Sequence, residues 1–463
     1  MTAPVVPGVL AEACSQVREA GPDDAVAGVT PRYVASPAGT DEAAAVMRAA
    51  AAEGMAVVPR GTGTRLGWGN PPDRCDLVID TRNMNRVLEH AVGDQVVRVQ
   101  AGAWLNQLAV TLGAAGQRLA LDPPRDGRSR PDAAAAATPG GSTAGTVGGI
   151  LASGAAGPLR LRYGTGRDLL IGITVVLANG TVARSGGKVV KNVAGYDLGK
   201  LFAGSYGTLG LIAEATFRLH PVPAAASYVT RDCADAAEAD AVIGAADGSA
   251  LAPSAAEVDR QARGTHIRAS VLLEGDPDGV AERCAAMTTL LSGLGGGTSV
   301  VSPDPPPWWG LGAAGAPGGT LIRIAFWSSA LPAVLDAVDA AGLAAGLDPV
   351  ISGSAAAGVL YAAVDEAAEP AAVSEFVAAL RAAVSGDHGT PAGPAAGSSA
   401  GAVFSATDGP PSRGSVVVLR APDAVRSVVD LWGPVPALGL MRAVKHQFDP
   451  EHRMAPGRFA GGI

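Results

Sequence analysis

The sequence predicts a mixed α/β (α+β) fold composed of two parts that differ in pattern. Residues 1 to about 222 alternate short apolar runs and helix signals with loops rich in glycine and threonine. Residues 223 to about 420 alternate strand-like and helix-like runs, which indicates an antiparallel sheet backed by helices. The 463 residues suit two or three domains, and a hydrophobic content of 48% supports buried cores.

A helix, a strand and a glycine-rich loop follow one another near the N-terminus. Thr40 is expected to cap a helix that ends near Gly54 and carries acidic residues in its first turn. The apolar run 55–58 predicts a buried strand that ends at Pro59 and opens into a loop of glycine and threonine, Pro59 to Thr64. A single glycine-rich turn is weak evidence for a binding site, because most such turns are only tight turns. A second loop of the same kind lies downstream.

The second loop has the most informative composition in the chain. Residues 140–158 are rich in glycine and hydroxyl side chains and carry no charge, so they have no polar face for an amphipathic helix. Glycine lets backbone N–H groups approach a ligand closely, and a helix start favours anions. We therefore expect both loops to grip the pyrophosphate of a nucleotide cofactor. The alternatives are a flexible linker and a transmembrane helix, and Pro139 with the dense glycines argues against the helix.

The other elements of the first part follow from local patterns. A helix is expected over 104–115, and Asn179-Gly180 is expected to turn a hairpin. The expected strands are 76–80, 95–100, 171–177, 181–183 and 209–219. Residues 125–139 interrupt the pattern and are interpreted as a mobile insertion.

Residues 223–422 are interpreted as a smaller cap domain that resembles paired ferredoxin-like units. Strands are expected at 266–273, 320–326, 357–364 and 414–420, and helices at 279–293, 329–345 and 370–384. The Gly/Pro-rich stretches 303–319 and 387–412 are expected to be links, the second of them disordered in part. Residues 1–222 then form the first domain, and residues 423–463 form a segment that returns to it.

Charge and cysteine content exclude several classes of protein. A net charge of −8 argues against a nucleic-acid-binding surface. The four cysteines contain no CxxC pair, which excludes an obvious zinc or iron–sulfur site. Scattered thiols fit a reducing compartment, and we see neither a signal peptide nor a convincing membrane span. We therefore expect a cytoplasmic protein without a metal.

The two loops, together with the segment Gly204-Ser205-Tyr206-Gly207-Thr208-Leu209-Gly210-Leu211-Ile212, resemble the vanillyl-alcohol-oxidase/PCMH family of FAD-binding domains. The resemblance covers residues of about 30 to 222 and implies a PCMH-type FAD-binding domain. In that family the loops hold the flavin pyrophosphate and ring, and the third segment closes the site. The cofactor-binding residues that this implies are Pro59, Arg60, Gly61, Thr62, Gly63, Thr64, Thr146, Gly148, Gly149, Ala152, Ser153, Gly154, Leu159, Tyr163, Gly207, Gly210 and Ile212.

A closer resemblance is to the FAD-binding E subunits of bacterial glycolate oxidases. It is carried by residues 188–198, 204–207, 154–160 and the tail over 417–458. It implies an FAD-dependent oxidoreductase subunit that takes part in oxidising a 2-hydroxy acid to a 2-oxo acid. The implied partners are a D-type FAD subunit and an iron–sulfur subunit that receives the electrons. The complex could also hold the chain at the inner face of the plasma membrane.

Departures from the catalytic relatives bear on this interpretation. Those relatives carry a Gly-Asp-Gly-Asn-x-His stretch and further metal-binding residues, and this sequence has none and only isolated histidines. Tyr206 stands where they usually have Glu, and Ala455 stands where they have Asn before Pro-Gly. The missing metal residues and Tyr206 favour the E-subunit interpretation and argue against independent hydroxy-acid oxidation.

Cofactor attachment and catalysis follow from the same resemblance. Covalent attachment needs a His or a His and Cys at the flavin loops, and residues 55–69 and 140–165 contain neither, so noncovalent FAD is expected. The catalytic candidates are Lys191, Asn192 and Tyr196. A lysine near the flavin or a substrate carboxylate stabilises negative charge, and a tyrosine stacks on an aromatic ring. The alternatives are a solvated loop lysine and a core tyrosine.

Other functions stay open at this point. One is a self-sufficient FAD-dependent dehydrogenase of another substrate, and another is a mainly structural flavoprotein subunit. A nicotinamide-binding domain is disfavoured because no Gly-x-Gly-x-x-Gly follows a first strand. Whether the flavin of this chain meets substrate or only relays electrons also stays open.

Overall fold

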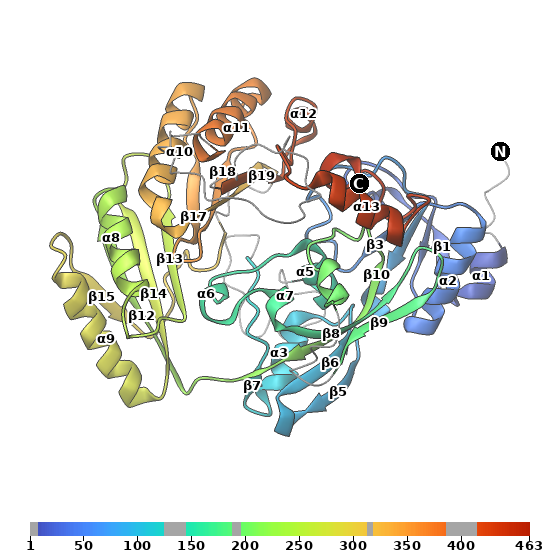
Figure 1. Ribbon diagram of the computed structural model, residues 1–463, viewed down its shortest axis with the longest axis horizontal. Helices are drawn as coiled ribbons and strands as arrows, with labels where there is room; N and C mark the ends of the chain where they lie inside the picture. The colour runs from blue at the N-terminus through green and yellow to red at the C-terminus, as the bar shows by residue number, and fades with distance from the viewer. Residues whose placement is uncertain (1–7, 125–144, 188–195, 313–317, 386–413) are drawn as a thin grey trace, which may run out of the picture.

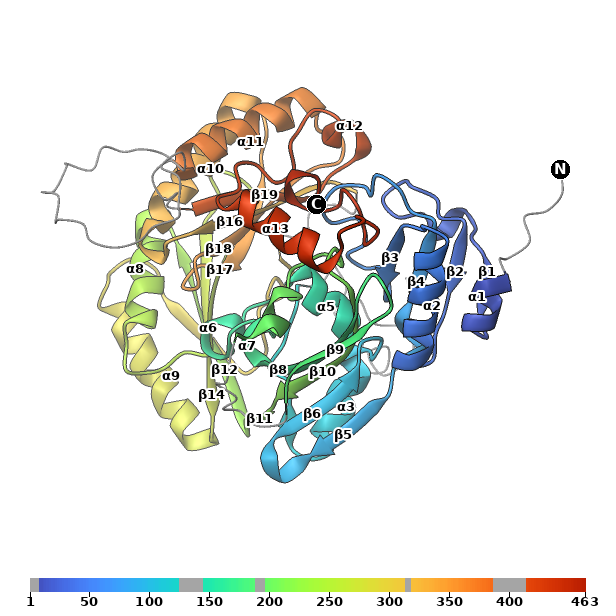
Figure 2. The same ribbon diagram turned by 45° about the vertical axis from the view of Figure 1, so that its right-hand side comes forward.

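The computed structural model describes residues 8–124, 145–187, 196–312, 318–385 and 414–463. Two smaller sheets and a glycine-lined loop region lie on one side of the molecule, and a large sheet backed by helices lies on the other (Figure 1). The C-terminal segment lies against the first side in both views (Figures 1 and 2).

The first sheet has four strands in the order β1-β2-β4-β3. Its strands are β1 (Val17–Glu19), β2 (Tyr33–Ala35), β3 (Val57–Arg60) and β4 (Leu77–Asp80), and α1 (Gly8–Ala13) and α2 (Thr40–Ala52) accompany it. β2 and β3 run parallel to β4. Pro59 lies within β3 at the edge of this sheet, where proline is tolerated because no inner ladder bond is lost.

The second sheet has five antiparallel strands in the order β5-β6-β10-β8-β9. They are β5 (Val87–Ala91), β6 (Val96–Gln100), β10 (Leu211–Arg218), β8 (Leu170–Val176) and β9 (Val182–Gly186). The predicted β8–β9 hairpin is present, with Gly180 at a φ of +80°. Helices α3 (Leu105–Gly113), α5 (Val147–Ser153), α6 (Arg160–Tyr163) and α7 (Gly166–Leu169) and the short pair β7 (Gln117–Arg118) and β11 (His220–Pro221) complete this part.

The large sheet is antiparallel, in the order β15-β12-β14-β13-β17-β18-β16-β19. Its first half contains β12 (Ala225–Cys233), α8 (Ala236–Asp247), β13 (Ala255–Arg260), β14 (Ile267–Gly275), α9 (Pro277–Ser292) and β15 (Ser299–Ser302). Its second half contains β16 (Thr320–Phe326), α10 (Leu331–Ala345), β17 (Val350–Ser354), β18 (Val359–Val364), α11 (Pro370–Ser385) and β19 (Gly414–Arg420). Each half repeats one βαββαβ topology, and β13 joins β17. The prediction of paired ferredoxin-like units is thus confirmed.

Helices α8 to α11 cover one face of the large sheet, and the opposite face turns toward α5 and α6 (Figure 1). The stretch Ser328–Ala345 is the described segment that is long and apolar enough to cross a membrane by length and composition. It includes α10, whose Leu331, Leu335 and Val338 lie in the core beneath the helices.

The C-terminal segment packs against β3 and the loop that follows it. It contains α12 (Asp423–Arg426) and α13 (Leu438–Phe448). The buried Lys445 ammonium donates hydrogen bonds to the carbonyls of Thr208 (2.7 Å) and Met454 (2.9 Å) and to the Asp449 carboxylate (2.6 Å). The Ala455 N–H then donates to the Val57 carbonyl at 2.8 Å, so the tail runs beside β3.

Several sequence predictions need correction. The first long helix begins at Thr40 with Gly39 as its N-cap, and β3 continues through Pro59 to Arg60. Strands β12, β13, β15 and β17 and helix α8 were not predicted. The predicted insertion over 125–139 and the link over 387–412 lie outside the described residues.

Candidate functional site

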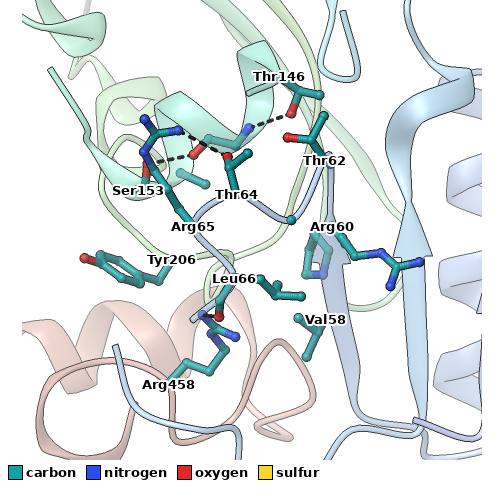
Figure 3. A pocket seen from close by; sticks show the side chains of 15 residues that line it. Val58, Arg60, Thr62, Thr64, Arg65, Leu66, Thr146, Ser153, Tyr206 and Arg458 are labelled. Atoms are coloured by element: carbon teal, nitrogen blue, oxygen red, sulfur yellow. Dashed lines mark hydrogen bonds between the residues drawn. The ribbon is translucent and has the colours of Figure 1, made fainter. Parts of the chain in front are cut away.

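Three cavities lie along the loop that follows β3 and are together called the trough here; Figure 3 shows the residues that line one of them. Two cavities of about 80 and 60 Å³ and a wider hollow of about 530 Å³ adjoin one another there. All three share Arg60 and Gly61, so they are continuous along the loop. Helix α5 and the segment before β10 form the opposite wall.

The wall formed by α5 offers a tight and uncharged surface. The Thr146 hydroxyl caps the helix by accepting a hydrogen bond from the Gly149 N–H at 3.3 Å. The Ser153 hydroxyl donates to the Gly149 carbonyl at 2.8 Å. These side chains are therefore oriented by the helix itself, and Thr146, Gly149 and Ser153 all line the trough.

Two glycines make the close approach of the two loops possible. A Cβ atom on Gly61 would collide with the Thr146 hydroxyl oxygen. A Cβ on Gly148 would lie 2.8 Å from the Cβ of Ala101. Larger residues at either position would force the walls of the trough apart.

The side chain of Arg60 points away from the two smaller cavities, toward residues that line the wider hollow. Its guanidinium pairs with Asp24 at 3.0 Å and with Asp80 at 3.1 Å, and Figure 3 shows it turned toward the neighbouring strand. Arg18 holds the pKa of the Asp24 carboxyl well below its ordinary value. The charge of Arg60 is therefore neutralised by these two carboxylates.

Arg458 reaches the trough from the C-terminal tail. One of its nitrogens donates hydrogen bonds to the carbonyls of Leu66 and Trp68, both at 2.8 Å. Burial lowers the pKa of the guanidinium to about 10. Its Nε and Nη1 atoms are buried without a hydrogen-bond partner among the described residues. A buried cation with unused donors fits an anionic ligand.

Tyr206 forms part of the wall of both smaller cavities. Its backbone is left-handed, with a φ of +57°, a strained conformation for a residue with a side chain. Its ring lies edge-on to Trp432, with centroids 5.1 Å apart, and 5.6 Å from Phe459. Burial raises the pKa of the phenol, and the charges of Arg323 and Arg458 oppose that rise.

Most of the predicted cofactor-binding residues meet at the trough. Those that line it are Pro59, Arg60, Gly61, Thr62, Gly63, Thr64, Thr146, Gly148, Gly149, Ala152, Ser153, Gly207, Gly210 and Ile212. Their assignment to FAD stays a prediction.

Three predicted residues lie outside this lining. Gly154 ends α5 in a left-handed conformation. Leu159 packs against Trp308 and Trp309. The Tyr163 hydroxyl accepts a hydrogen bond from Arg118 and donates to Glu274. These residues position the elements around the trough.

The catalytic candidates are not assembled in the described structure. Lys191 and Asn192 lie outside the described residues. Tyr196 is 94% exposed, so the core interpretation is wrong, and it does not line the trough cavities. The reason is its place in an exposed turn just before the 3-10 helix Leu198–Leu201.

The cysteines do not form a group. Cys14, Cys75, Cys233 and Cys284 are free and buried. Across the described ranges, no three His, Cys, Asp or Glu side chains gather as a metal-binding group.

Sequence reasoning missed several trough residues. Val58, Arg65 and Leu66 flank the predicted loop, and Tyr206 was noted only as a departure from relatives. Arg458 lies almost 400 positions from the loop whose carbonyls it contacts. Sequence spacing carries no signal for such a contact.

A comparison with protein-family models matches residues 31–129 and 131–186 to the family described as "FAD binding domain". These residues contribute both loops of the trough. This match identifies an FAD-binding domain over these residues and supports FAD as the cofactor.

Relatives of known name match part of this chain. Glycolate oxidase subunit GlcD of Bacillus subtilis is 36% identical over 200 residues, which are 42% of this chain and 39% of that protein. D-lactate dehydrogenase of Archaeoglobus fulgidus is 36% identical over 188 residues, which are 41% of this chain and 38% of that protein. Glycolate oxidase subunit GlcE of Escherichia coli K12 is 31% identical over 176 residues, which are 38% of this chain and 45% of that protein. The chain thus spans less than half the length of each.

Solved structures share the whole fold at low identity. p-Cresol methylhydroxylase is 17% identical with a TM-score of 0.68, covering 97% of this chain and 95% of that one. Alkyldihydroxyacetonephosphate synthase is 16% identical with a TM-score of 0.64, and the match covers 98% of this chain and 86% of that one. The predicted PCMH-type fold with its cap is thereby confirmed.

Proposed function

We propose that this chain is an FAD-carrying subunit of a glycolate oxidase-like complex that oxidises a 2-hydroxy acid to a 2-oxo acid. The observation that carries the proposal is the trough, because it joins two amide-rich loops to the unpartnered Arg458 nitrogens. Similarity to both GlcD and GlcE supports the class of complex. Assignment to the E subunit rests on the sequence motifs and is part of the proposal.

The residues of the trough have separate tasks in this proposal. The loop and α5 amides hold the pyrophosphate, and Tyr206 with its aromatic neighbours forms one wall. Arg458 supplies positive charge close to the cofactor. Bound FAD supplies the acceptor for the hydride that leaves C2 of the substrate. Lys191, Asn192 and Tyr196 remain proposed contributors from the sequence motif.

The proposed partners are a D-type FAD subunit and an iron–sulfur subunit. A cluster needs several neighbouring cysteine ligands, and the four cysteines of this chain are buried in separate places. Electrons leaving the flavin then pass to another chain. We propose a cytoplasmic location, in the complex, and the domain boundaries 1–222, 223–422 and 423–463 given above.

A self-sufficient FAD-dependent dehydrogenase is the second candidate. Similarity to a D-lactate dehydrogenase, at the same identity as to GlcD, favours it. The fold similarity to p-cresol methylhydroxylase extends over 97% of this chain and so includes the cap.

Dye-linked oxidation assays separate the two candidates. The FAD-loaded chain is assayed with glycolate and D-lactate, alone and after co-expression with a D-type flavoprotein and an iron–sulfur subunit. We expect little turnover by the chain alone and activity in the assembled complex. Turnover by the isolated chain at ordinary enzyme rates, on the order of 1–10³ per second, would favour the self-sufficient dehydrogenase.

A further inference from the structure

The part of the tail that follows α13, residues 449–463, lies along β3 and the loop after it. The Val57 N–H donates to the Arg453 carbonyl, and the Ala455 N–H donates to the Val57 carbonyl, both at 2.8 Å. Arg458 then donates to two carbonyls of the loop, both at 2.8 Å. The tail is thus docked at two places, and Arg458 at the second of them lines the cavity of about 80 Å³ (Figure 3).

The backbone of the tail is strained where it meets β3. Ala455 is fully buried and has a left-handed φ of +41°, and His452 has a φ of +50°. Residues other than glycine seldom adopt this conformation. Such strain persists only where the surrounding contacts enforce it. Docking of the tail therefore costs free energy that its contacts must offset.

Burial of Arg458 adds a second cost. Its side chain belongs to a residue that is 3% exposed, and its Nε and Nη1 atoms have no hydrogen-bond partner among the described residues. The groups that accept from its remaining nitrogen are neutral carbonyls. A buried cation without its full set of acceptors is costly, and an anion that completes the set lowers this cost.

Two indole nitrogens beside Arg458 are in the same situation. The carbonyl of Trp68 accepts a hydrogen bond from Arg458, and the ring of Trp432 lies 4.6 Å from that of Phe459. The Nε1 atoms of both tryptophans are buried without a hydrogen-bond partner among the described residues. The seam between the tail and the loop thus gathers donors that still need acceptors. A diphosphate offers such acceptors together with negative charge.

The two smaller cavities of the trough must widen to hold a nucleotide. They measure about 80 and 60 Å³, whereas ligand sites commonly measure roughly 300–1,000 Å³. A wall therefore moves when a cofactor enters. The tail is the wall whose docking combines a strained backbone with a buried cation that lacks acceptors, so we expect the tail to be the wall that moves.

We propose that the tail is a strap that docks fully only when an anionic cofactor occupies the trough. This inference rests on the proposed function, because it takes the diphosphate of FAD as the anion. The tail opens to admit the cofactor, and Arg458 then binds a negative group of the cofactor while it still holds the loop carbonyls. Binding and docking favour each other by the same factor, so the tail of the cofactor-free chain is undocked more often.

Hydrogen–deuterium exchange, read by mass spectrometry on the flavin-free and the FAD-loaded chain, tests the strap. FAD should slow exchange of the peptide 449–459 about five- to a hundredfold, the usual range of coupling between two sites. Helix α10 should exchange at the same rate in both states, because it lies in the cap. Riboflavin, which lacks the diphosphate, should not protect the peptide.

Three variants sharpen the test. Arg458→Met removes the cation, so its tail should exchange rapidly with or without FAD, and its FAD affinity should fall about ten- to a hundredfold. Ala455→Gly relieves the strained φ without adding atoms, so its flavin-free tail should exchange more slowly than that of the parent. Arg184→Met is the matched control, because Arg184 is an exposed arginine on β9 outside the trough lining. It should leave the protection by FAD unchanged.

The outcomes separate the strap from the proposed function. Equal exchange of the tail in the flavin-free and FAD-loaded parent overturns the strap and leaves FAD binding standing. Protection by riboflavin, or full protection in Arg458→Met, also overturns it, and so does a loss of protection that extends to α10. Protection confined to the tail, in a chain whose assembled complex oxidises no 2-hydroxy acid, supports the strap and refutes the proposed function. A parent chain that binds no FAD overturns both.

Discussion

At the scale of single residues, the trough depends on positions where a side chain is missing. Gly149 lines both small cavities, and a Cβ there would meet only the Thr146 hydroxyl, at 3.2 Å. A side chain at this position requires the Thr146 hydroxyl to move by a few tenths of an ångström. The space is kept open for a ligand.

Gly149→Asp is expected to abolish FAD binding. The carboxylate would occupy the cavity and repel the pyrophosphate. The flavin-to-protein absorbance ratio of the purified chain measures this. Gly244→Asp on the exposed face of α8, where a Cβ meets nothing within 4 Å, is the control and should keep normal flavin content. Normal flavin content in Gly149→Asp would show that the loop is wrongly assigned.

A buried acid gives a second prediction at this scale. Glu257 of β13 accepts a hydrogen bond from Ser354, and burial raises its pKa from 4.5 to about 8. The folded state therefore holds the proton more tightly than the unfolded state does. This stabilising contribution is complete below about pH 4.5 and is lost as the pH rises toward 8.

Glu257→Gln removes this titration while the amide oxygen still accepts from Ser354. We expect the unfolding free energy of the variant, relative to the parent, to increase between pH 6 and pH 8.5 by as much as a few kcal/mol, since one pKa unit corresponds to about 1.4 kcal/mol. Denaturant unfolding at the two pH values checks it, with the exposed Glu282→Gln of α9 as control. Parallel pH profiles for the parent and Glu257→Gln would contradict the prediction.

At the scale of elements, the C-terminal helix completes the site. Lys445 of α13 and its partner Asp449 are both fully buried, and Lys445 also holds the carbonyls of Thr208 and Met454. These contacts join α13 to the segment before β10 and to the tail that carries Arg458.

Lys445→Met is expected to destabilise the chain by about 3–5 kcal/mol, because it leaves the Asp449 charge buried and unpaired. FAD content should fall with it, since the tail that carries Arg458 loosens. Thermal unfolding and flavin content measure the two effects. Arg442→Met is the matched control, because Arg442 is a cation on the same helix but is exposed, and its loss should change stability little. A fully stable Lys445→Met chain would contradict this account.

At the scale of the whole molecule, the binding site is made by parts far apart in the chain. The loop after β3, helix α5, the segment before β10 and the tail surround one trough. Cys75 lies within electrostatic reach of Arg60 and Arg458, and burial raises its pKa to about 12. Its thiol therefore stays protonated and is a poor nucleophile.

The flavin is accordingly expected to be noncovalent. Neither loop contains a His or Cys over residues 55–69 and 140–165, and the Cys75 thiol is unreactive. Precipitation with trichloroacetic acid should release the yellow chromophore into the supernatant. A chromophore that stays in the protein pellet would refute the prediction.

The sequence by itself determined the local structure wherever a pattern is strong. The hairpin at Asn179-Gly180, strand β16 and helix α10 appear where apolar periodicity and turn residues predict them. Both loops of the trough were found in the same way, since clustered glycines show where a backbone must approach a ligand. Strands such as β13 and β17 were missed because they are short and contain residues such as Asp259 and Gly353 that are depleted in strands.

Only the tertiary structure decided which of these residues meet. Tyr206 and Arg458 come from the segment before β10 and from the tail, and both line the same cavity although no periodicity relates them. Thr146 and Gly61 approach each other because sheets and helices far apart in sequence pack together. The physical reason is that local patterns follow from nearest-neighbour geometry, whereas the charge and shape of the trough follow from long-range packing of whole elements.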